Sequence, residues 1–427
     1  MEKSYRIIDL KDNKKLTEYL VQNGQFLMPM VELIEASRLA IDELIDVLGR
    51  ASIEAVLQLS AMSVAGEKHQ GRKGGTIGWH GSQSGTVKLS ERKVRVKKPR
   101  LRRKGQRKGG EVEIPAYEAI NGGSRMGERI LEILMCNVST RSYRHVIGEM
   151  AESVGVSKSS VSRQFIEQSS KELERLCERR FDDIELLVIY LDGLVFSEHH
   201  VICAVGVDAD GKKHVLGLVE GASENGASAT SLLEDLVERG VDPSRKYLFV
   251  IDGSKALRSA IRKVFGPQNP VQRCRNHKLK NVCDKLPDEL ADQVKSVMKA
   301  AYKLPYKEGI SRLKQQAAWL EVHHPGAAAS LLEGLEETFT INRLELPASL
   351  RRCLASTNII ESPYSGVRMR TRRVSCWKNG SMVLRWVASA FLAVEESFRR
   401  IQGYRDLWML KARLESDYAI EAKEEAA

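Results

Sequence analysis

The spacing of apolar residues divides the chain into a helical first part and a second part that begins with strands. Residues 26–66 and 127–179 place apolar side chains three and four positions apart, the spacing that aligns them on one face of a helix. Both segments are therefore predicted to be helical. For 26–66, a small packing or dimer-forming unit and a DNA-binding role both fit the pattern.

From residue 184 the pattern becomes that of strands. Residues 184–192 (IELLVIYLD) and 246–252 (KYLFVID) are continuous apolar runs, typical of strands buried on both faces, and each ends in an aspartate. The remaining predicted elements are two strands within 199–221 joined by a turn at Asp208–Lys212, helices at 228–240 and 254–265, and a short strand at 271–274 followed by a helix. The order β-β-β-α-β-α-β-α is that of a ribonuclease H-like fold, an α/β domain on a mixed sheet.

Two helical segments complete the layout. Residues 287–355 contain no convincing strand and are predicted to be an α-helical insertion. Residues 381–416 form an amphipathic helical tail, for which core packing or dimerisation is expected. The predicted regions are 1–70 (helical), 71–126 (glycine-rich link and basic β/loop segment), 127–180 (helix-turn-helix region), 181–286 (first part of the core), 287–355 (insertion) and 356–427 (end of the core and tail).

The composition is that of a folded intracellular protein. Of the 427 residues, 42% are hydrophobic and 29% are charged, which excludes a wholly disordered chain. No apolar run reaches the roughly 18–20 residues of a membrane span, and the N-terminal residues lack the apolar core of a signal peptide. Seven cysteines without paired CxxC spacings suit a reducing cytosol. A cytoplasmic location without membrane association is expected.

The positive charge is concentrated in one segment. The chain has 67 Lys and Arg against 56 Asp and Glu, and residues 92–108 hold eleven of the basic residues and no acidic one. Removing those eleven leaves 56 basic residues, equal to the acidic count. Such a segment is expected to bind a polyanion through phosphate contacts that depend on salt but not on base sequence, and a merely solvated face is the alternative.

The local pattern around this basic segment predicts a link, a strand and a loop. Six glycines within 71–85 favour a flexible link, and the absence of a following GKS or GKT argues against a phosphate loop. Residues 86–98 alternate as a ribbon or edge strand, which Pro99 is predicted to break before an exposed loop at 100–108. The candidate DNA-binding residues here are Arg92, Lys93, Arg95, Lys97, Lys98, Arg100, Arg102 and Arg103.

Residues 138–165 have the pattern of a helix-turn-helix. A first helix is predicted through Tyr143 and Met150, followed by a turn at Gly155. Ser157 is predicted to cap a second helix that presents short polar and basic side chains to DNA. The candidate DNA-binding residues on it are Lys158, Ser159 and Arg163. A plain helical hairpin remains the alternative.

Two aspartates share one sequence context. Asp192 and Asp252 each follow an apolar run and precede a glycine, at the carboxyl ends of predicted strands, where open α/β sheets place their sites. If the strands are parallel neighbours, the carboxylates lie side by side and call for a cation such as Mg²⁺ or Mn²⁺ between them. The alternative is that each aspartate only ends its strand in a turn.

A third acidic ligand is expected from the C-terminal part of the chain. Glu361 is the only acid in a basic stretch, 356–381, and a metal site beside arginines suits a phosphodiester substrate. Two ions about 3.5–4 Å apart would activate the attacking oxygen and stabilise the leaving one. The arginines expected to clamp the DNA strand are Arg368, Arg370, Arg372 and Arg373.

Four ordered motifs resemble those of Mutator-type DDE transposases of bacterial insertion sequences. The motifs are LDG (191–193), IDGSKAL (251–257), QRCRNHKLKNV (272–282) and STNIIES (356–362) followed by RMRTRRV (368–374). The resemblance spans about 120–400 and implies a ribonuclease H-like core with a helical insertion before the last acid. It also implies that Asp192, Asp252 and Glu361 bind two Mg²⁺ or Mn²⁺ ions.

Other positions compare less simply with the family. Cys274 and His277 match a family Cys-x-x-His pair, interpreted as a structural or DNA-contacting pair beside the active site, with plain packing as the alternative. Family members commonly have Arg after the glutamate, where this chain has Ser362-Pro363, so Glu361 is predicted at or just before a helix start. For Trp377 and Trp386, packing is favoured over stacking on DNA bases.

The expected function is transposition of an insertion sequence. The partners implied are double-stranded DNA, both the terminal inverted repeats and the target, and a homodimer or larger assembly that joins two ends in the bacterial nucleoid. Two other hypotheses remain: a non-catalytic helix-turn-helix regulator, and a ribonuclease H-like nuclease that cuts branched DNA without joining ends.

Overall fold

The computed structural model divides into two compact units. The N-terminal unit comprises Met1–Ile130 and Thr140–Gln164, and the C-terminal unit comprises Leu131–Ser139 and Phe165–Ala427. Among the residues described, no helix is long and apolar enough to cross a membrane. The described residues are 41–68, 75–88, 93–105, 110–122, 126–138, 153–154, 158–221 and 225–424.

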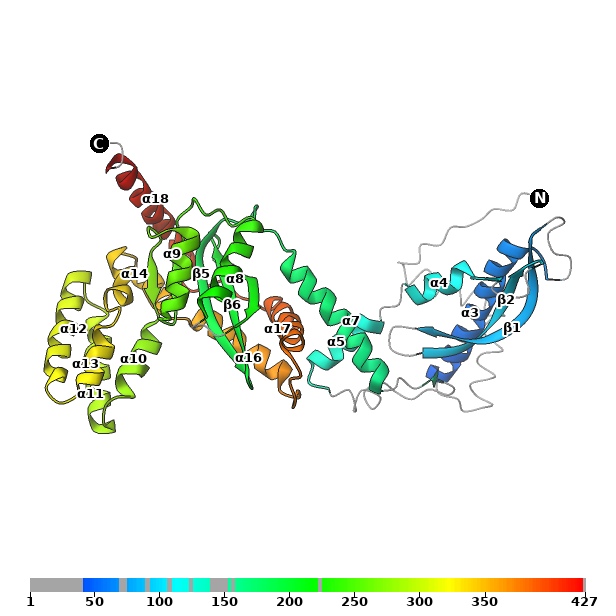
Figure 1. Cartoon of the computed structure of the whole chain (residues 1–427), viewed down its shortest axis with the longest axis horizontal. Helices are drawn as coiled ribbons and strands as arrows, with labels where there is room; N and C mark the ends of the chain where they lie inside the picture. Colours follow the sequence, from blue (N-terminus) through cyan, green and yellow to red (C-terminus); the bar gives the residue numbers. More distant parts are fainter. Residues whose placement is uncertain are drawn as a thin grey trace, which may run out of the picture. The chain divides into compact units, whose positions relative to one another are not determined.

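The N-terminal unit is an antiparallel sheet with helices packed on one face (Figure 1). Valines and leucines that alternate along the strands pack against Leu57, Ala61 and Ala65 of α3, which accounts for the one-sided burial of the sheet. The strand order is β1-β2-β3, and β4 also pairs with β2. The elements are α3 (Ile41–Ala65), β1 (Ile77–Lys88), β2 (Lys93–Arg103), β3 (Glu111–Val112), α4 (Pro115–Gly122) and β4 (Ser153–Val154).

The flexible link predicted at 71–85 is wrong for residues 77–85. These residues form most of β1, which pairs antiparallel with β2 from Ile77 to Lys88. Pairing supplies the backbone hydrogen bonds, and the Trp79 indole donates to the carbonyl of Gly66 at 2.8 Å. The register of β1 shifts between Trp79 and Ser82, and Gly81 allows this irregularity because it adopts a φ of +94°, which favours glycine. Glycine content alone therefore misidentified a paired strand.

The predicted break at Pro99 is also wrong, and the exposed loop predicted at 100–108 is wrong for residues 100–103, whereas Lys104 and Gly105 do lie in an exposed turn. β2 continues through Pro99 to Arg103, and Leu101 is fully buried. Pro99 pairs with Ser82, next to the irregularity of β1. It also lies between the residues of β2 that pair with β3 and with β4. Its missing N–H therefore falls where the ladder is already interrupted.

Helices before the second sheet agree with the helical prediction for 127–179 only in part. The structure has α5 (Met126–Met135) and α7 (Lys158–Cys177), so the second helix of the predicted helix-turn-helix begins at the expected residue. Residues 153–154 form β4 instead of helix, because they pair with Lys93 and Val94 of β2. The first predicted helix, through Tyr143 and Met150, lies outside the described residues, as do Gly155 and Ser157.

The C-terminal unit contains a five-stranded mixed sheet, as the sequence predicted. The strand order is β7-β6-β5-β8-β9, with β5, β6 and β7 antiparallel and β5, β8 and β9 parallel. Apolar residues on one face pack against α8 and α9 and form the main core. These elements are β5 (Leu186–Phe196), β6 (His199–Asp208), β7 (Lys213–Glu220), α8 (Gly226–Glu238), β8 (Leu248–Ile251), α9 (Lys255–Phe265), β9 (Val271–Arg273) and α10 (Arg275–Cys283).

The insertion predicted at 287–355 is entirely helical and has its own core. Side chains of α11, α12 and α13 pack around Met298, Leu313 and Phe339, together with Leu279 and Val282 of α10. Its elements are α11 (Asp288–Ala301), α12 (Tyr306–Glu321), α13 (Pro325–Leu332), η2 (Glu336–Phe339), α14 (Thr340–Arg343) and α15 (Ala348–Leu354).

The C-terminal helices pack on the second face of the sheet. α16 contacts β5, and α17 contacts β7 and β6. The tail predicted at 381–416 is helical, made of α17, the short η3 and α18, and α17 packs in the core as expected. The elements are α16 (Asn358–Thr371), α17 (Gly380–Glu395), η3 (Tyr404–Asp406) and α18 (Leu407–Glu424).

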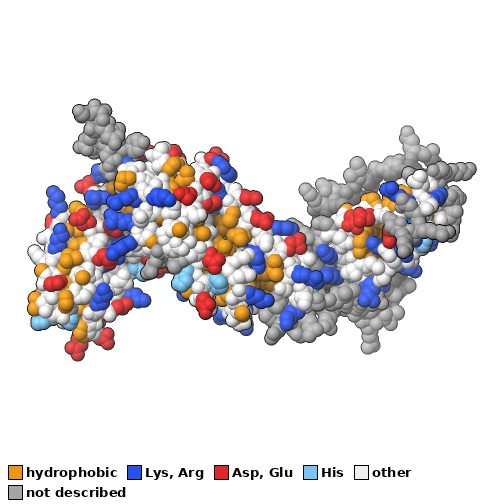
Figure 2. All heavy atoms as spheres, in the orientation of Figure 1, with side chains coloured by type: hydrophobic (Ala, Val, Ile, Leu, Met, Phe, Trp, Pro, Cys, Tyr) orange, Lys and Arg blue, Asp and Glu red, His pale blue; other side chains and the backbone are white. Residues whose placement is uncertain are grey.

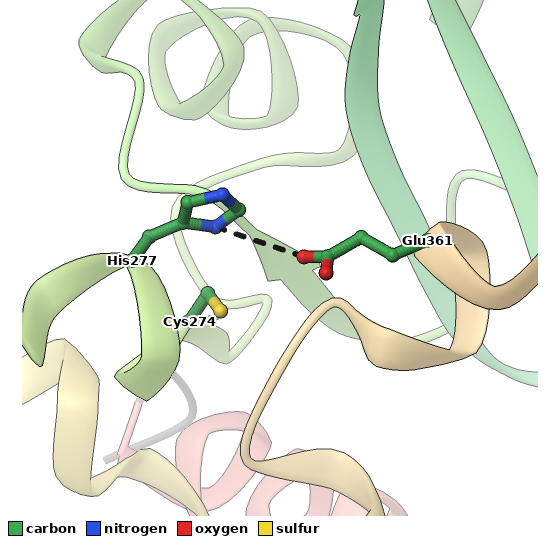
Figure 3. A group of neighbouring side chains, drawn as sticks. All are labelled: Cys274, His277 and Glu361. Carbon is green, nitrogen blue, oxygen red and sulfur yellow. Dashed lines mark ion pairs between the residues drawn. The ribbon is translucent and has the colours of Figure 1, made fainter. Parts of the chain in front are cut away.

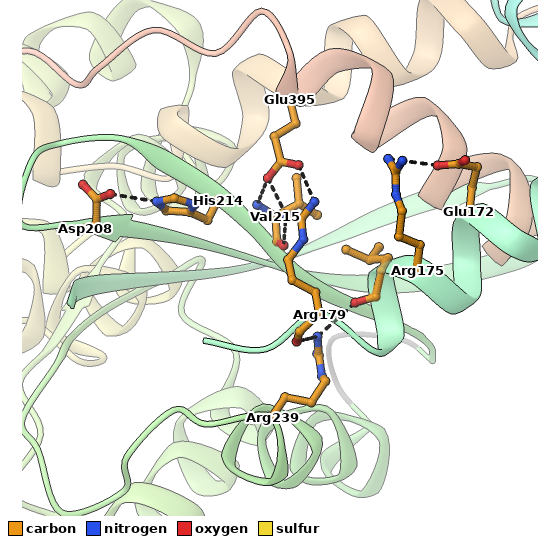
Figure 4. Close-up of polar contacts among 9 residues, drawn as sticks. Glu172, Arg175, Arg179, Asp208, His214, Val215, Arg239 and Glu395 are labelled. Carbon is orange, nitrogen blue, oxygen red and sulfur yellow. Dashed lines mark hydrogen bonds and ion pairs between the residues drawn. The ribbon is translucent and has the colours of Figure 1, made fainter. Parts of the chain in front are cut away.

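An ion pair joins α17 to the segment after α7 (Figure 4). The guanidinium of Arg179 donates to both carboxylate oxygens of Glu395, at 2.7 and 2.8 Å, and the amide of Val215 donates to the same carboxylate. Arg239 donates to the carbonyl of Leu176 at 3.1 Å and so satisfies the C-terminal end of α7. These contacts fix α17 against β7.

Candidate active site

Asp192 and Asp252 lie at matching positions on neighbouring strands. β5 and β8 are parallel, and the last pair in their register joins Leu191 to Ile251. The next residue in each case is an aspartate: Asp192 lies within β5, and Asp252 directly follows the end of β8, so the two residues start from adjacent points of the sheet. Successive strand residues face opposite sides, and Leu191 and Ile251 belong to the core under α8 and α9. Asp192 therefore faces the side away from α8 and α9, and the carboxylate of Asp252 is near enough to raise its pKa.

The interpretation that Asp192 ends a strand in a turn is wrong. β5 continues to Phe196, and Asp192 pairs with Cys203 of β6. The pairing of β5 with β8 ends at Leu191, whereas the pairing with β6 continues to Phe196. The backbone of Asp192 is therefore paired with β6 on one edge and not with β8 on the other. Asp252 does form a turn, because its Oδ1 accepts a 2.8 Å hydrogen bond from the amide of Ser254.

Glycine is required at position 253, directly after Asp252, because a side chain would not fit there. Gly253 has a φ of +112°, and a Cβ there would lie 2.1 Å from Nε of Arg273. The guanidinium of Arg273 thus lies against the backbone directly after Asp252. A cavity of about 540 Å³ opens at this point and is lined by Asp252, Gly253, Lys255 and Arg273 among others. Asp252 is therefore accessible from solvent.

Glu361 comes from the first turn of α16 and approaches the same face. Tyr364 follows one turn later, is buried, and donates its hydroxyl to the carbonyl of Asp192 at 3.1 Å. Residues three apart share a face of a helix, so this bond directs Glu361 toward the end of β5. Asp192 thus interacts electrostatically with both of the other sequence-predicted acids, Asp252 and Glu361.

The effect predicted for Pro363 is only partly correct. Glu361 does lie in the first helical turn, but α16 begins earlier, at Asn358, and includes Pro363 in its interior. The proline removes the amide that would bond to the carbonyl of Ile359. Its buried ring, next to the buried Tyr364, offsets that loss by packing. The departure from the family pattern therefore leaves Glu361 in the site.

The charges of the site act on one another. Burial, and after it the neighbouring carboxylates of Asp252 and Glu361, together raise the pKa of Asp192 to about 7, against the opposing effect of His277. Asp192 is only 7% exposed. Desolvation and like charge both disfavour ionisation, and a bound cation would relieve both. The site therefore has the electrostatic character of a cation site.

Cys274 and His277 lie directly beside Glu361 (Figure 3). One ligand atom from each of the three residues lies within 4.8 Å of the others, and Nδ1 of His277 is 3.9 Å from Oε1 of Glu361. Its hydrogen bond with Cys274 raises the pKa of His277 to about 9, despite burial. Burial by itself would raise the pKa of Cys274, but hydrogen bonds from His277 and Thr357 lower it overall. The pair is thus polar and belongs to the active-site surroundings.

Two basic residues of the QRCRNHKLKNV motif, Arg275 and Lys278, face away from solvent. Arg275 donates to the carbonyl of Thr338 at 2.8 Å, and Lys278 donates to the carbonyls of Ser330 and Glu333 at 2.5 Å each. Burial lowers the pKa of Arg275 to about 10 and that of Lys278 to about 8. One side of β9 and α10 therefore fastens the helical insertion, while Cys274 and His277 point toward Glu361. The sequence analysis missed this division.

The cations of β2 fall into two groups. Arg95 and Lys97 are exposed and pair across the sheet with Thr86 and Ser84. The others that have described partners are held within the N-terminal unit: Lys93 by Ser160 at 2.9 Å, Arg100 by Glu111 at 3.1 Å, and Lys98 over the ring of Tyr117 at 4.0 Å. Arg102 is half-buried and Arg103 is exposed, whereas Arg92 lies outside the described residues.

Basic side chains are also exposed elsewhere, and Figure 2 shows them on the visible surface of both units. Lys158, Ser159 and Arg163 are exposed at the start of α7. At the end of α16, Arg368, Arg372 and Arg373 are exposed and Arg370 is half-buried. The basic surface thus extends beyond the segment that carries the charge surplus.

The two tryptophans pack, as favoured by the sequence analysis. The ring of Trp386 lies 4.4 Å from that of Phe165, and the ring of Trp377 lies 5.1 Å from that of Phe196. Trp377 and Trp386 also contact each other edge to face at 6.4 Å. They stabilise the C-terminal unit.

A mixed α/β domain with a cluster of acids and a separate basic unit has the parts expected of a transposase. Residues 23–400 match the family described as "Transposase, Mutator family", and the chain belongs to that family.

Curated relatives of the chain are insertion-sequence transposases. The transposase for insertion sequence element ISRM5 of Rhizobium meliloti (strain 1021) is 27% identical over 310 residues, 70% of this chain and 76% of the relative. The transposase for insertion sequence element IS256 in transposon Tn4001 of Staphylococcus aureus is 25% identical over 286 residues, 63% of this chain and 70% of the relative. The transposase for IS6120 of Mycolicibacterium smegmatis is 28% identical over 234 residues, 52% of this chain and 69% of the relative.

Proposed function

We propose that this transposase binds the terminal inverted repeats of an insertion sequence and catalyses metal-dependent DNA cleavage and strand transfer. The observation that carries the proposal is the proximity of three acids: Asp192 in β5 and Asp252 directly after β8 start from adjacent points of the sheet, and both Asp252 and Glu361 of α16 raise the pKa of Asp192. Three carboxylates in one partly buried place require a positive partner, and family membership supplies the reaction class.

The strand arrangement supports a ribonuclease H-like core. Three antiparallel strands precede two parallel strands, and the central β5 carries the first acid. The first acid lies in a strand, the second directly after a strand and the third in a helix, with the helical insertion before the last one. This arrangement keeps catalytic side chains on rigid elements, which favours their exact mutual placement.

The donor set fits Mg²⁺ or Mn²⁺. All three proposed ligands are carboxylates, the hard oxygen donors that these ions prefer. Asp192, Asp252 and Glu361 would together hold two ions, which lower the pKa of an attacking water or hydroxyl and stabilise the leaving oxygen when bound. The protein's own part is to keep the three carboxylates oriented and partly desolvated. No nucleophilic side chain is required.

DNA binding is assigned to the exposed basic groups. Arg95 and Lys97 on β2 and the N-terminal residues of α7 would contact phosphates, since exposed cations release counterions from DNA when they bind it. Arg368 and Arg370 follow Glu361 on α16, Arg372 and Arg373 come directly after the helix, and these arginines would hold the strand being cut. Because two element ends must be joined, a dimer or larger assembly is expected on DNA.

The test is strand cleavage by Asp192→Asn. With a duplex carrying the element's own terminal repeat and Mg²⁺ or Mn²⁺, the variant should lose cleavage and strand transfer but retain end binding. Asp183→Asn is the matched control, because Asp183 is exposed on the loop before β5. Cleavage by Asp192→Asn at the wild-type rate would overturn the assignment. Cutting of branched DNA without joining by the wild-type protein would indicate a nuclease instead.

A further inference from the structure

Thr357 occupies the centre of the group formed by Cys274, His277 and Glu361. It is fully buried at the start of α16. Its Oγ1 lies 3.3 Å from Sγ of Cys274 and 3.4 Å from Nδ1 of His277, and it donates a short hydrogen bond to Oε1 of Glu361. One hydroxyl thus contacts all three side chains.

The single hydroxyl proton goes to the carboxylate. A threonine hydroxyl has one hydrogen and two lone pairs, and the shortest of its three contacts is the one with Glu361. A hydrogen bond to an ionised carboxylate is also stronger than one to a thiol. The hydroxyl oxygen is then free to accept from Nδ1 of His277. Sγ of Cys274 instead accepts a hydrogen bond from the backbone amide of Thr357, at 3.4 Å.

This use of the hydroxyl departs from the usual role of threonine at a helix start. A threonine at the N-cap normally accepts a hydrogen bond from an amide of the first turn. Thr357 is the N-cap of α16 and makes no such bond, whereas Ser254 and Asn379 make one at the starts of α9 and α17. The hydroxyl of Thr357 is therefore committed to Glu361 rather than to its helix.

The same geometry argues against a metal ion held by Cys274, His277 and Glu361. The three ligand atoms are close enough to share an ion, but the hydroxyl of Thr357 lies among them. An ion at that point would have to displace a fully buried side chain. The Cys-x-x-His pair then serves to fix Thr357 in place.

We propose that Thr357 is a positioning residue that holds the carboxylate of Glu361 toward Asp192 and Asp252, and that Cys274 and His277 support Thr357. The inference rests on the proposed function, because it assumes that Glu361 shares a cation with the two aspartates. Hydrogen bonds to a ligating carboxylate fix its orientation, and their loss typically costs about 10- to 100-fold in metal affinity.

The test compares Thr357→Val with Thr357→Ser in the full chain. Valine keeps the branched shape and the amide bond to Cys274 but removes the hydroxyl, whereas serine keeps the hydroxyl. Mn²⁺ affinity, measured directly by electron paramagnetic resonance, should fall about tenfold or more in Thr357→Val and recover largely in Thr357→Ser. Wild-type Mn²⁺ affinity in Thr357→Val would overturn the proposal. If the valine variant does not fold, Thr357→Ala removes the same hydroxyl and decides the question.

A double-variant comparison shows whether Thr357 acts through Glu361. In the Glu361→Gln background, Thr357→Val should change Mn²⁺ affinity no further, since the carboxylate that it positions is gone. An additional tenfold loss there would show that the threonine acts on the fold instead and would contradict the proposal.

Two controls separate this inference from the proposed function. If Asp192→Asn binds Mn²⁺ and cleaves DNA as the wild type does, the proposed function fails as well. If Asp192→Asn loses both and Thr357→Val loses neither, only the role of Thr357 fails. Zn²⁺ binding that disappears in Cys274→Ser would place a metal where the hydroxyl lies and would overturn the supporting role of Cys274 and His277.

Discussion

The two sheets of the molecule differ in what surrounds their charged residues. In the N-terminal sheet, buried valines alternate with solvated cations such as Arg95 and Lys97, so one face is a core and the other is open to a partner. In the C-terminal sheet both faces are covered, and Asp192 lies among apolar strand residues. Solvated charge suits contact with a phosphate backbone, and desolvated charge suits chemistry. The predictions below test this division.

The largest effect is expected from Asp252→Asn. Removing one of three carboxylates should lower the DNA cleavage rate by about a thousandfold or more, since metal-assisted catalysis supplies several kcal/mol and each 1.4 kcal/mol is a factor of ten. Binding of the terminal repeat, measured by fluorescence anisotropy, should stay within about twofold, because the basic groups remain intact. A parallel loss of binding would show that the two tasks are not divided between the sheets.

A large loss of stability is expected from Arg275→Met. Arg275 is buried, donates to Thr338 and Asn342, and stacks on the ring of Tyr302 at 4.5 Å. Its removal leaves buried acceptors unsatisfied and should lower the free energy of unfolding by about 2–4 kcal/mol. Denaturant unfolding measures this change. The exposed Arg372→Met serves as the control, with an expected change within about 0.5 kcal/mol.

A smaller effect, on binding alone, is expected from the double substitution Arg95→Ser with Lys97→Ser. Loss of two phosphate contacts should weaken DNA binding about tenfold and reduce the slope of log affinity against log salt by about 2. Cleavage at saturating DNA should be unchanged. Lys299→Ser with Lys307→Ser removes the same charge from exposed positions of the insertion and should leave the slope unaltered. An equal change of the salt slope in both double variants would show that β2 contributes only through the net charge of the protein.

The smallest effect is a pH dependence of stability in the presence of a chelator. Burial and neighbouring carboxylates raise the pKa of Asp192 to about 7 from 3.8. The folded state therefore holds this proton more tightly than the unfolded state, and the resulting stability is present at low pH and lost as pH rises from about 4 through 7. Asp192→Asn should accordingly be more stable than the wild type at pH 8, on the order of 1–2 kcal/mol, and the difference should shrink toward pH 4. A difference that is constant across this range would contradict the raised pKa.

The C-terminal sheet was predictable because each of its strands carries its own signal in a short stretch of sequence. Continuous apolar runs before Asp192 and Asp252 identified strands buried on both faces, and the strand order brought the two acids together. The assignment of Glu361 to the site depended on family resemblance, since a single acid among arginines does not indicate where it lies relative to the two aspartates. Pro363 suggested a later helix start than the structure has, because the packing of its ring is a tertiary effect.

The N-terminal sheet was predicted less well for a related reason. Glycines in 71–85 and Pro99 usually interrupt regular structure, but pairing of β1 with β2 overrides that tendency. The roles of Arg275 and Lys278 could not be read from charge, because whether a cation binds DNA or a buried carbonyl depends on what folds over it. Thr357 had one available signal, a hydroxyl four residues before Glu361, but that spacing is common in helices and does not specify a role.

The central claim is that one cation site joins Asp192, Asp252 and Glu361. Its most direct test replaces Mg²⁺ with Fe²⁺ and adds hydrogen peroxide and ascorbate: the bound Fe²⁺ reduces the peroxide to a hydroxyl radical and hydroxide, ascorbate restores Fe²⁺, and the radical cuts the backbone beside the ion. The account predicts cuts near residues 192, 252 and 361 in the wild type, and their loss in Asp192→Asn. Cuts near 274–277 and 361, without any near 192 or 252, would place the metal with Cys274 and His277 and contradict the account.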